Sequence, residues 1–82
     1  MNAAVKVGDV IKSLDFPGNN ECYRIGKVVA IDGEIYTCAG IEIMWEGRSK
    51  PSTQVEELFS TPMEGAHMFD SYFPGRITVI TQ

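Results

Sequence analysis

The sequence is poor in the side chains that catalysis and metal binding most often use. Its 82 residues include one histidine, His67, and two cysteines, Cys22 and Cys38. A zinc site needs about four closely spaced ligands, so we expect no metal site. Glycine-rich phosphate-binding loops and serine nucleophile motifs do not occur in the sequence. His67 could form an acid–base pair with Asp70 or Cys22, but any small domain contains such combinations by chance. We therefore expect no cofactor and no enzymatic activity.

Positive charge is also scarce. Seven lysines and arginines stand against eleven aspartates and glutamates, which gives a net charge of −4 and an isoelectric point near 4.8. That sign disfavours contact with phosphate groups, so we expect no direct nucleic-acid binding. The first residues carry no apolar core of signal-peptide length, and no stretch approaches the roughly 20 apolar residues of a membrane span. We therefore expect a cytoplasmic protein without membrane association.

The two cysteines are expected to be reduced thiols. Without a secretory signal, disulfide formation is not the default state. A two-residue hairpin at Asp32-Gly33 would place Cys38 opposite Lys27, about 16 Å along the strand from Cys22, whereas bridged Cα atoms lie within about 7 Å. Both cysteines are therefore interpreted as small buried apolar residues.

What the chain has in quantity is regularly spaced glycine. Its eight glycines separate apolar, β-branched and aromatic runs that are too short for helices but long enough for strands. Asp32-Gly33 predicts a β-hairpin, and Gly26 predicts a bulge or a sharp bend at a barrel corner. In the strand that follows the hairpin, three alternating residues are expected to face the core: Ile41, Ile43 and Trp45.

The remaining segments complete the predicted architecture. Residues 15–20 are expected to form a long turn-rich loop, and the polar stretch 47–53 a second, mobile loop. Residues 54–59 could form a short helix or a strand, with a slight preference for the strand. The β-branched run 76–81 is expected to pair with the first strand and close the sheet. We predict one all-β domain over residues 1–82, an SH3-like barrel of about five strands with long loops.

Several short motifs resemble a group of small, functionally unassigned proteins from bacteriophages and bacteria. They are Val7-Gly8-Asp9, Asp15-Phe16-Pro17-Gly18, Cys22-Tyr23, Gly26-Lys27-Val28-Val29, Thr61-Pro62-Met63-Glu64-Gly65 and Gly75-Arg76-Ile77-Thr78-Val79. The match covers most of the chain and departs at Glu64, where an asparagine would be expected. The resemblance implies an SH3-like barrel and a phage-encoded accessory factor that binds or inhibits a host protein.

The segment from Met63 to Phe73 is richer in apolar side chains than a connection between strands usually is. In the preferred interpretation, Met68, Phe69 and Phe73 fold back and plug the open end of a thin barrel. In the other, part of the segment stays exposed and binds a protein, and Tyr23 and Tyr36 extend the surface. The candidate partner-binding residues are Met63, His67, Met68, Phe69, Tyr72 and Phe73.

The sequence is compatible with three functions, of which a non-enzymatic protein-binding module is preferred. The first alternative is an acidic mimic of nucleic acid that inhibits a nucleic-acid-binding protein; it requires acidic residues gathered on one face. The second is a structural phage component that self-associates. The candidate acidic face consists of Glu42, Glu46, Glu56 and Glu57, and the oligomeric state is not predicted.

Overall fold

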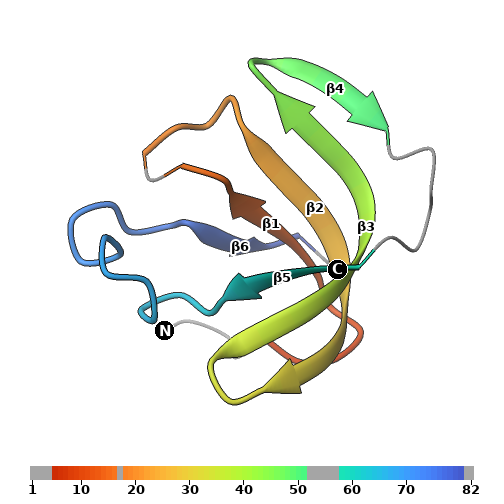
Figure 1. Ribbon diagram of the computed structural model, residues 1–82, viewed down its shortest axis with the longest axis vertical. Helices are drawn as coiled ribbons and strands as arrows, with labels where there is room; N and C mark the ends of the chain where they lie inside the picture. Colours follow the sequence, from red (N-terminus) through yellow and green to blue (C-terminus); the bar gives the residue numbers. More distant parts are fainter. Residues whose placement is uncertain (1–4, 17, 52–57, 81–82) are drawn as a thin grey trace.

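The protein is built from antiparallel strands (Figure 1). The computed structural model describes residues 5–16, 18–51 and 58–80. The strands are β1 (Val10–Leu14), β2 (Tyr23–Asp32), β3 (Ile35–Trp45), β4 (Arg48–Pro51), β5 (Leu58–Pro62) and β6 (Ile77–Val79). No helix occurs in the described ranges, so the predicted all-β class is confirmed.

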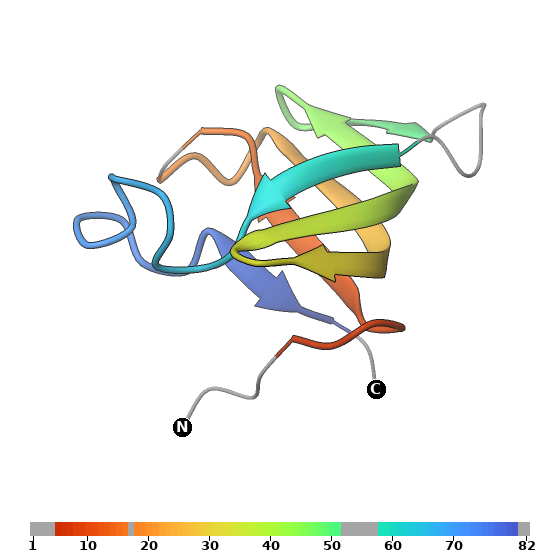
Figure 2. The ribbon, with the colours of Figure 1, turned by 60° about the horizontal axis from the view of Figure 1, so that its bottom comes forward.

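One long strand organises the sheet. The strand order is β4-β3-β2-β1-β6, and β5 pairs with the first half of β3 while β4 pairs with its second half. The sheet therefore curls around a small core, and Figure 2 shows its strands wrapping into a barrel-like shape. The last strand pairs with β1 as the sequence predicted, with Ile77 opposite Ser13 and Val79 opposite Ile11.

The predicted hairpin between β2 and β3 exists, but its turn lies one residue further along the chain. Asp32 pairs with Ile35, so the two central residues are Gly33 and Glu34. Gly33 has a φ of 62°, and Glu34 is not in the left-handed region, which is the pattern of a turn with glycine at its first central position. Asp32 therefore belongs to the strand, and Cys38 lies opposite Val28 instead of Lys27.

A second hairpin connects β3 and β4, where the sequence predicted a loop. Trp45 pairs with Arg48, and the central residues Glu46 and Gly47 have φ values of 51° and 75°. Positive φ at both positions is typical of a type I′ turn, whose first residue is most often asparagine, aspartate or glycine. The expected loop at 47–53 is thus wrong for Arg48–Pro51, which forms a strand, and its last two residues lie outside the described ranges.

The predicted irregularity at Gly26 is confirmed, and its cause is a close approach of side chain to backbone. The register shifts between Ile25 and Gly26. A methyl group on Gly26 would lie 2.6 Å from Cε2 of Phe59 and 2.9 Å from the carbonyl oxygen of Ala39. Only glycine leaves room there for the Phe59 ring to cover the strand.

The expected core face of β3 is wrong. Ile41 and Trp45 are 48% and 41% exposed and Ile43 is half-buried, whereas Tyr36 and Cys38 of the same strand are buried. The reason is that Tyr36, Cys38 and Gly40 are buried at alternate positions, so the side of the strand that carries Ile41 is the one that faces away from the core. Ile41 is also the extra residue between Gly40 and Glu42 at the register shift. The core consists of Ile11, Val28, Tyr36 and Cys38, with Val5, Phe59, Met63 and Ile77 packed against it.

The segment 54–59, left open between helix and strand, is described only at its end. Leu58 and Phe59 begin β5, and they pair with Ala39 and Cys38 of β3. Residues 54–57 lie outside the described ranges. The extended alternative is therefore correct for the described part of the segment.

The turn geometry predicts that one substitution stabilises the protein at Glu46 but not at Glu34. Glu46→Asn should raise the free energy of unfolding by about 1 kcal/mol, because asparagine tolerates the left-handed conformation that glutamate resists. Glu34→Asn is the matched control, since it changes the same residue type at a turn position without positive φ. Chemical denaturation of both variants measures the difference, and equal effects would contradict the assignment of the two turns.

The two cysteines are free and buried, as expected. Burial raises the pKa of the Cys38 thiol from 9.0 to about 11, so this thiol is protonated and unreactive at neutral pH. A thiol-specific reagent should therefore modify Cys38 slowly in the folded protein and should find two free thiols after denaturation without a reductant. Fast native modification of Cys38, followed by mass spectrometry, would contradict its burial.

Candidate binding site

The segment between β5 and β6 is held by a buried arginine. Arg76 lies just before β6, and its guanidinium donates hydrogen bonds to the carbonyl oxygens of Pro62 and Met63, both at 2.8 Å. Its Nη1 also donates to Oγ1 of Thr61 at 3.1 Å. The side chain therefore binds the end of β5, where the segment leaves the sheet.

Asp70 completes this arrangement from the middle of the segment. Its Oδ1 accepts a hydrogen bond from Nε of Arg76 at 2.8 Å, and its Oδ2 accepts one from Nη2 at 3.1 Å. Oδ2 also accepts the backbone N–H groups of Gly65 and His67, at 2.8 and 3.0 Å. Both charged side chains are 5% exposed, so this is a buried, two-point ion pair with its remaining acceptors occupied.

The electrostatics of Asp70 follow from these contacts. Hydrogen bonds from Arg76, assisted by those from the His67 and Gly65 amides, lower the pKa of the carboxyl group from 3.8 to about 2, although burial acts in the opposite direction. The carboxylate therefore stays ionised through the neutral and mildly acidic range. Glu64 ties down the end of the same segment, since its carboxylate accepts the N–H groups of Gly75 and Ile77 at 3.3 and 2.8 Å.

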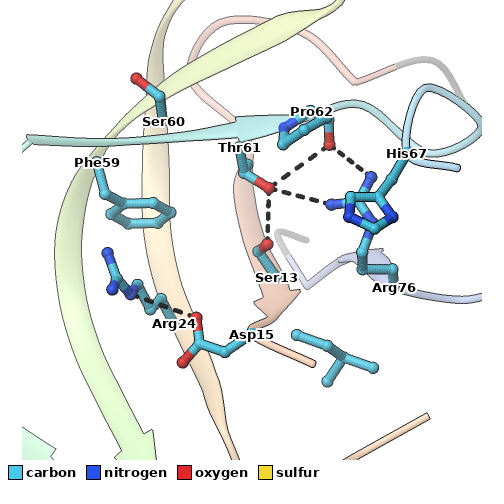
Figure 3. A pocket seen from close by; sticks show the side chains of 10 residues that line it. Ser13, Asp15, Arg24, Phe59, Ser60, Thr61, Pro62, His67 and Arg76 are labelled. Atoms are coloured by element: carbon cyan, nitrogen blue, oxygen red, sulfur yellow. Dashed lines mark hydrogen bonds and ion pairs between the residues drawn. The ribbon is translucent and has the colours of Figure 1, made fainter. Parts of the chain in front are cut away.

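The same side chains connect the two sides of the sheet. No strand ladder joins β5 to β1 or β6 among the described residues. Instead, the hydroxyl groups of Ser13 on β1 and Thr61 on β5 share a hydrogen bond of 2.8 Å, and Arg76 binds Thr61 from the start of β6. Figure 3 shows these groups facing one another across the gap. A side-chain network therefore takes the place of a ladder at this seam.

The segment held in this way presents its apolar side chains outward. Met68 and Tyr72 are 77% and 76% exposed, and Phe69 and Phe73 are exposed as well. The preferred expectation, that Met68, Phe69 and Phe73 plug the barrel, is therefore wrong. The physical reason is that Asp70 turns inward to meet Arg76, and tight turns on both sides of it direct the neighbouring side chains away from the core.

The other two candidate residues of the segment, Met63 and His67, are less exposed. Met63 is half-buried and packs against the core, so it anchors the segment. His67 is half-buried, and its Nδ1 accepts the backbone N–H of Phe69 at 3.2 Å. The exposed side chains of Met68, Phe69, Tyr72 and Phe73 therefore form an apolar patch.

The loop between β1 and β2 lies on the same side of the molecule as the segment between β5 and β6 (Figures 1 and 2). A methyl group on Gly18 would lie 3.0 Å from the Phe73 ring, so the loop and the patch are in contact. In the same loop, Phe16 is exposed and its ring centroid lies 5.8 Å from that of Trp45. Two residues of this loop thus contact aromatic rings elsewhere in the chain, Gly18 at Phe73 and Phe16 at Trp45, which the sequence did not reveal.

Of the two tyrosines expected to extend the surface, Tyr36 does not, because it is buried in the core. Tyr23 is half-buried on β2, and Nζ of Lys12 lies 4.9 Å from its ring centroid. Of the candidate acidic face, Glu42 is half-buried on β3 and Glu46 is exposed in the β3–β4 turn. Glu56 and Glu57 lie outside the described residues.

A polar pocket of about 240 Å³ opens at the seam (Figure 3). Buried Ser13, Thr61 and Arg76 line it, together with an ion pair between Nε of Arg24 and Oδ1 of Asp15 at 3.4 Å. The remaining lining residues are Leu14, Phe59, Ser60, Pro62 and His67. His67 thus lies between the pocket and the apolar patch.

Compared with models of protein families, with curated proteins and with solved structures, the chain shows no significant match. No helix within the described ranges has the length and apolarity to cross a membrane. In the same part of the chain, no three His, Cys, Asp or Glu side chains are grouped in a way that could hold a metal ion.

The network predicts a large effect of an isosteric change at Asp70. Asp70→Asn should lower the free energy of unfolding by about 3 kcal/mol or more, because the buried Arg76 charge loses its counterion. Asp32→Asn is the control, since Asp32 is exposed at the end of β2. Urea denaturation measures both, and similar small effects would show that the ion pair does not hold the fold.

The lowered pKa of Asp70 predicts where this stabilisation disappears. The carboxyl group titrates near 3.8 in the unfolded chain and near 2 in the fold, so ionised Asp70 stabilises the native state above about pH 4. This contribution should be lost as the pH falls from about 4 towards 2. The stability difference between the wild type and Asp70→Asn should shrink over that range, and a constant difference would contradict the assignment.

Proposed function

We propose that the protein is a non-enzymatic protein-binding module that recognises its partner through the apolar patch. The observation that carries this proposal is the exposure of Met68, Phe69, Tyr72 and Phe73 on a segment that a buried ion pair holds in one conformation. Methionine and aromatic side chains are enriched at protein interfaces, and small soluble proteins seldom expose them together.

Preorganisation supports the same proposal. Binding through a disordered segment loses affinity because the segment must be ordered first. Here the Gly65 and His67 amides are bound to Asp70, and tight turns link His67 to Asp70 and Phe69 to Phe73. The exposed side chains therefore rest on a backbone that needs little further ordering.

The polar groups near the patch favour binding over catalysis. The Asp70 carboxylate accepts hydrogen bonds from the backbone N–H groups of His67 and Gly65 and from Arg76. It therefore has a structural role. Cys22 is buried, and its sulfur accepts the backbone N–H of Glu46 at 3.5 Å. Neither group is placed to work with the His67 ring as an acid, base or nucleophile. The resemblance to small phage proteins extends the proposal to an accessory factor that binds or inhibits a host protein.

The proposal predicts which substitution weakens binding once affinity capture has identified a partner. Tyr72→Ala should weaken the complex by about 2 kcal/mol, roughly thirtyfold in Kd, because an exposed aromatic anchor supplies a large share of interface energy. The fold should be retained, since Tyr72 is mostly exposed. Isothermal titration calorimetry measures the affinity.

Val29→Ala is the matched control, because Val29 is an exposed apolar residue at the extra position of β2. It should leave the Kd unchanged. The proposal would be contradicted if Tyr72→Ala bound normally while Glu42→Lys and Glu46→Lys abolished binding. Such a result, together with a steep dependence of the affinity on salt concentration, would favour the acidic-mimic alternative.

A further inference from the structure

The pocket at the seam is lined by polar side chains that a hydrogen-bond network already holds in place. Ser13 and Thr61 contribute hydroxyl groups, and both residues are more than nine-tenths buried. Thr61 accepts from Arg76 and donates to the carbonyl oxygen of Pro62 at 3.5 Å, so the hydrogen bond that it shares with Ser13 is donated by Ser13. Both hydroxyl protons are therefore engaged, and other polar side chains of the pocket are left to donate to a ligand.

Arg24 supplies the charged group of the pocket. Asp15 contacts it through Nε, the inner nitrogen of the guanidinium, and the group lies over the Phe59 ring at 5.8 Å. The two terminal nitrogens, which carry four of the five N–H groups, make no hydrogen bond to protein in the described part of the chain. Two parallel N–H groups of this kind match the two oxygens of a carboxylate.

His67 adds a further donor at the rim. Its Nδ1 accepts the Phe69 amide, so the neutral imidazole carries its proton on Nε2, which acts as a donor. Figure 3 shows the ring beside Arg76 at the edge of the pocket. Among the polar side chains that line the pocket, Asp15 is the one that can only accept hydrogen bonds when ionised.

We propose that this pocket binds a carboxylate group through the terminal nitrogens of the Arg24 guanidinium, while the imidazole of His67 leaves a second donor at the rim for another part of the ligand. A singly charged carboxylate fits better than a dianionic phosphate, because Asp15 lies 3.4 Å from Arg24 and repels the extra charge. Resting on the proposed function, the inference assigns this carboxylate to an acidic residue of the partner, bound next to the apolar patch.

The test is a titration of the isolated protein with small carboxylates, followed by NMR of backbone amides and of arginine Nε–H groups. Acetate, but not an equal concentration of chloride, should shift the signals of Ser13, Arg24 and His67 with saturation. A capped peptide that carries one glutamate should produce the same shifts, and its glutamine counterpart should not. Binding of acetate without binding of the glutamate peptide would overturn the assignment to a partner residue.

Variants make the test specific to the pocket. Arg24→Gln should weaken acetate binding roughly tenfold or more, because the charged donors are lost. Asp15→Asn should tighten it, since the repelling charge is removed. Arg48→Gln is the control, because Arg48 is exposed beside the β3–β4 turn and does not line the pocket.

Three results would overturn the inference: shifts that do not saturate, equal binding by Arg24→Gln and the wild type, or tighter binding of inorganic phosphate than of acetate. The titration needs no partner protein, whereas the Tyr72→Ala experiment does not involve the pocket. Failure of one proposal is therefore distinguishable from failure of the other.

Discussion

The ion pair between Arg76 and Asp70 is the interaction on which the rest of the structure depends. A small barrel must join the two edges of its sheet, and here β5 has no strand partner on the side of β1 and β6 within the described residues. Arg76 spans that gap by binding Thr61 and two carbonyl groups at the end of β5. An arginine buried to this degree needs a counterion, and Asp70 supplies it from the following segment.

This solution links the stability of the barrel to the shape of its proposed binding surface. Asp70 must point inward to meet Arg76, so the side chains around it in the sequence are left on the outside. In an 82-residue chain, exposing Met68, Phe69, Tyr72 and Phe73 removes apolar area from an already thin core. The buried polar network fixes the segment with hydrogen bonds instead of hydrophobic packing.

The sequence predicted those parts of the fold that depend on local chemistry. Glycine spacing and β-branched runs indicated strands, the terminal run was correctly paired with β1, and Gly26 marked a real irregularity. The turn at Gly33 was placed one residue early, because either neighbour of the glycine could complete it. The core face of β3 was wrong because alternation shows which residues share a face but not which face meets the core, and here the core face is that of Tyr36 and Cys38.

The candidate site was predicted in its residues but not in its arrangement. Composition alone singled out the segment from Met63 to Phe73, but could not distinguish a core plug from an exposed patch. One signal was present in the sequence: Asp70 stands within an apolar segment, and Arg76 stands directly before the last strand. Buried charges need partners, so these two could have been paired. The position of the β1–β2 loop and the pocket at the seam depend on contacts between segments far apart in the chain, so no local sequence pattern predicts them.

Hydrogen exchange of the Gly65 and His67 amides tests the central claim most directly, because both donate to Asp70 and lie in the segment rather than in the sheet. The account predicts that they exchange as slowly as the Met63 amide, which donates to the Glu34 carbonyl at the edge of β3. It also predicts that Asp70→Asn removes this protection. Exchange of Gly65 and His67 in the wild type at the rate of an unstructured peptide would contradict it.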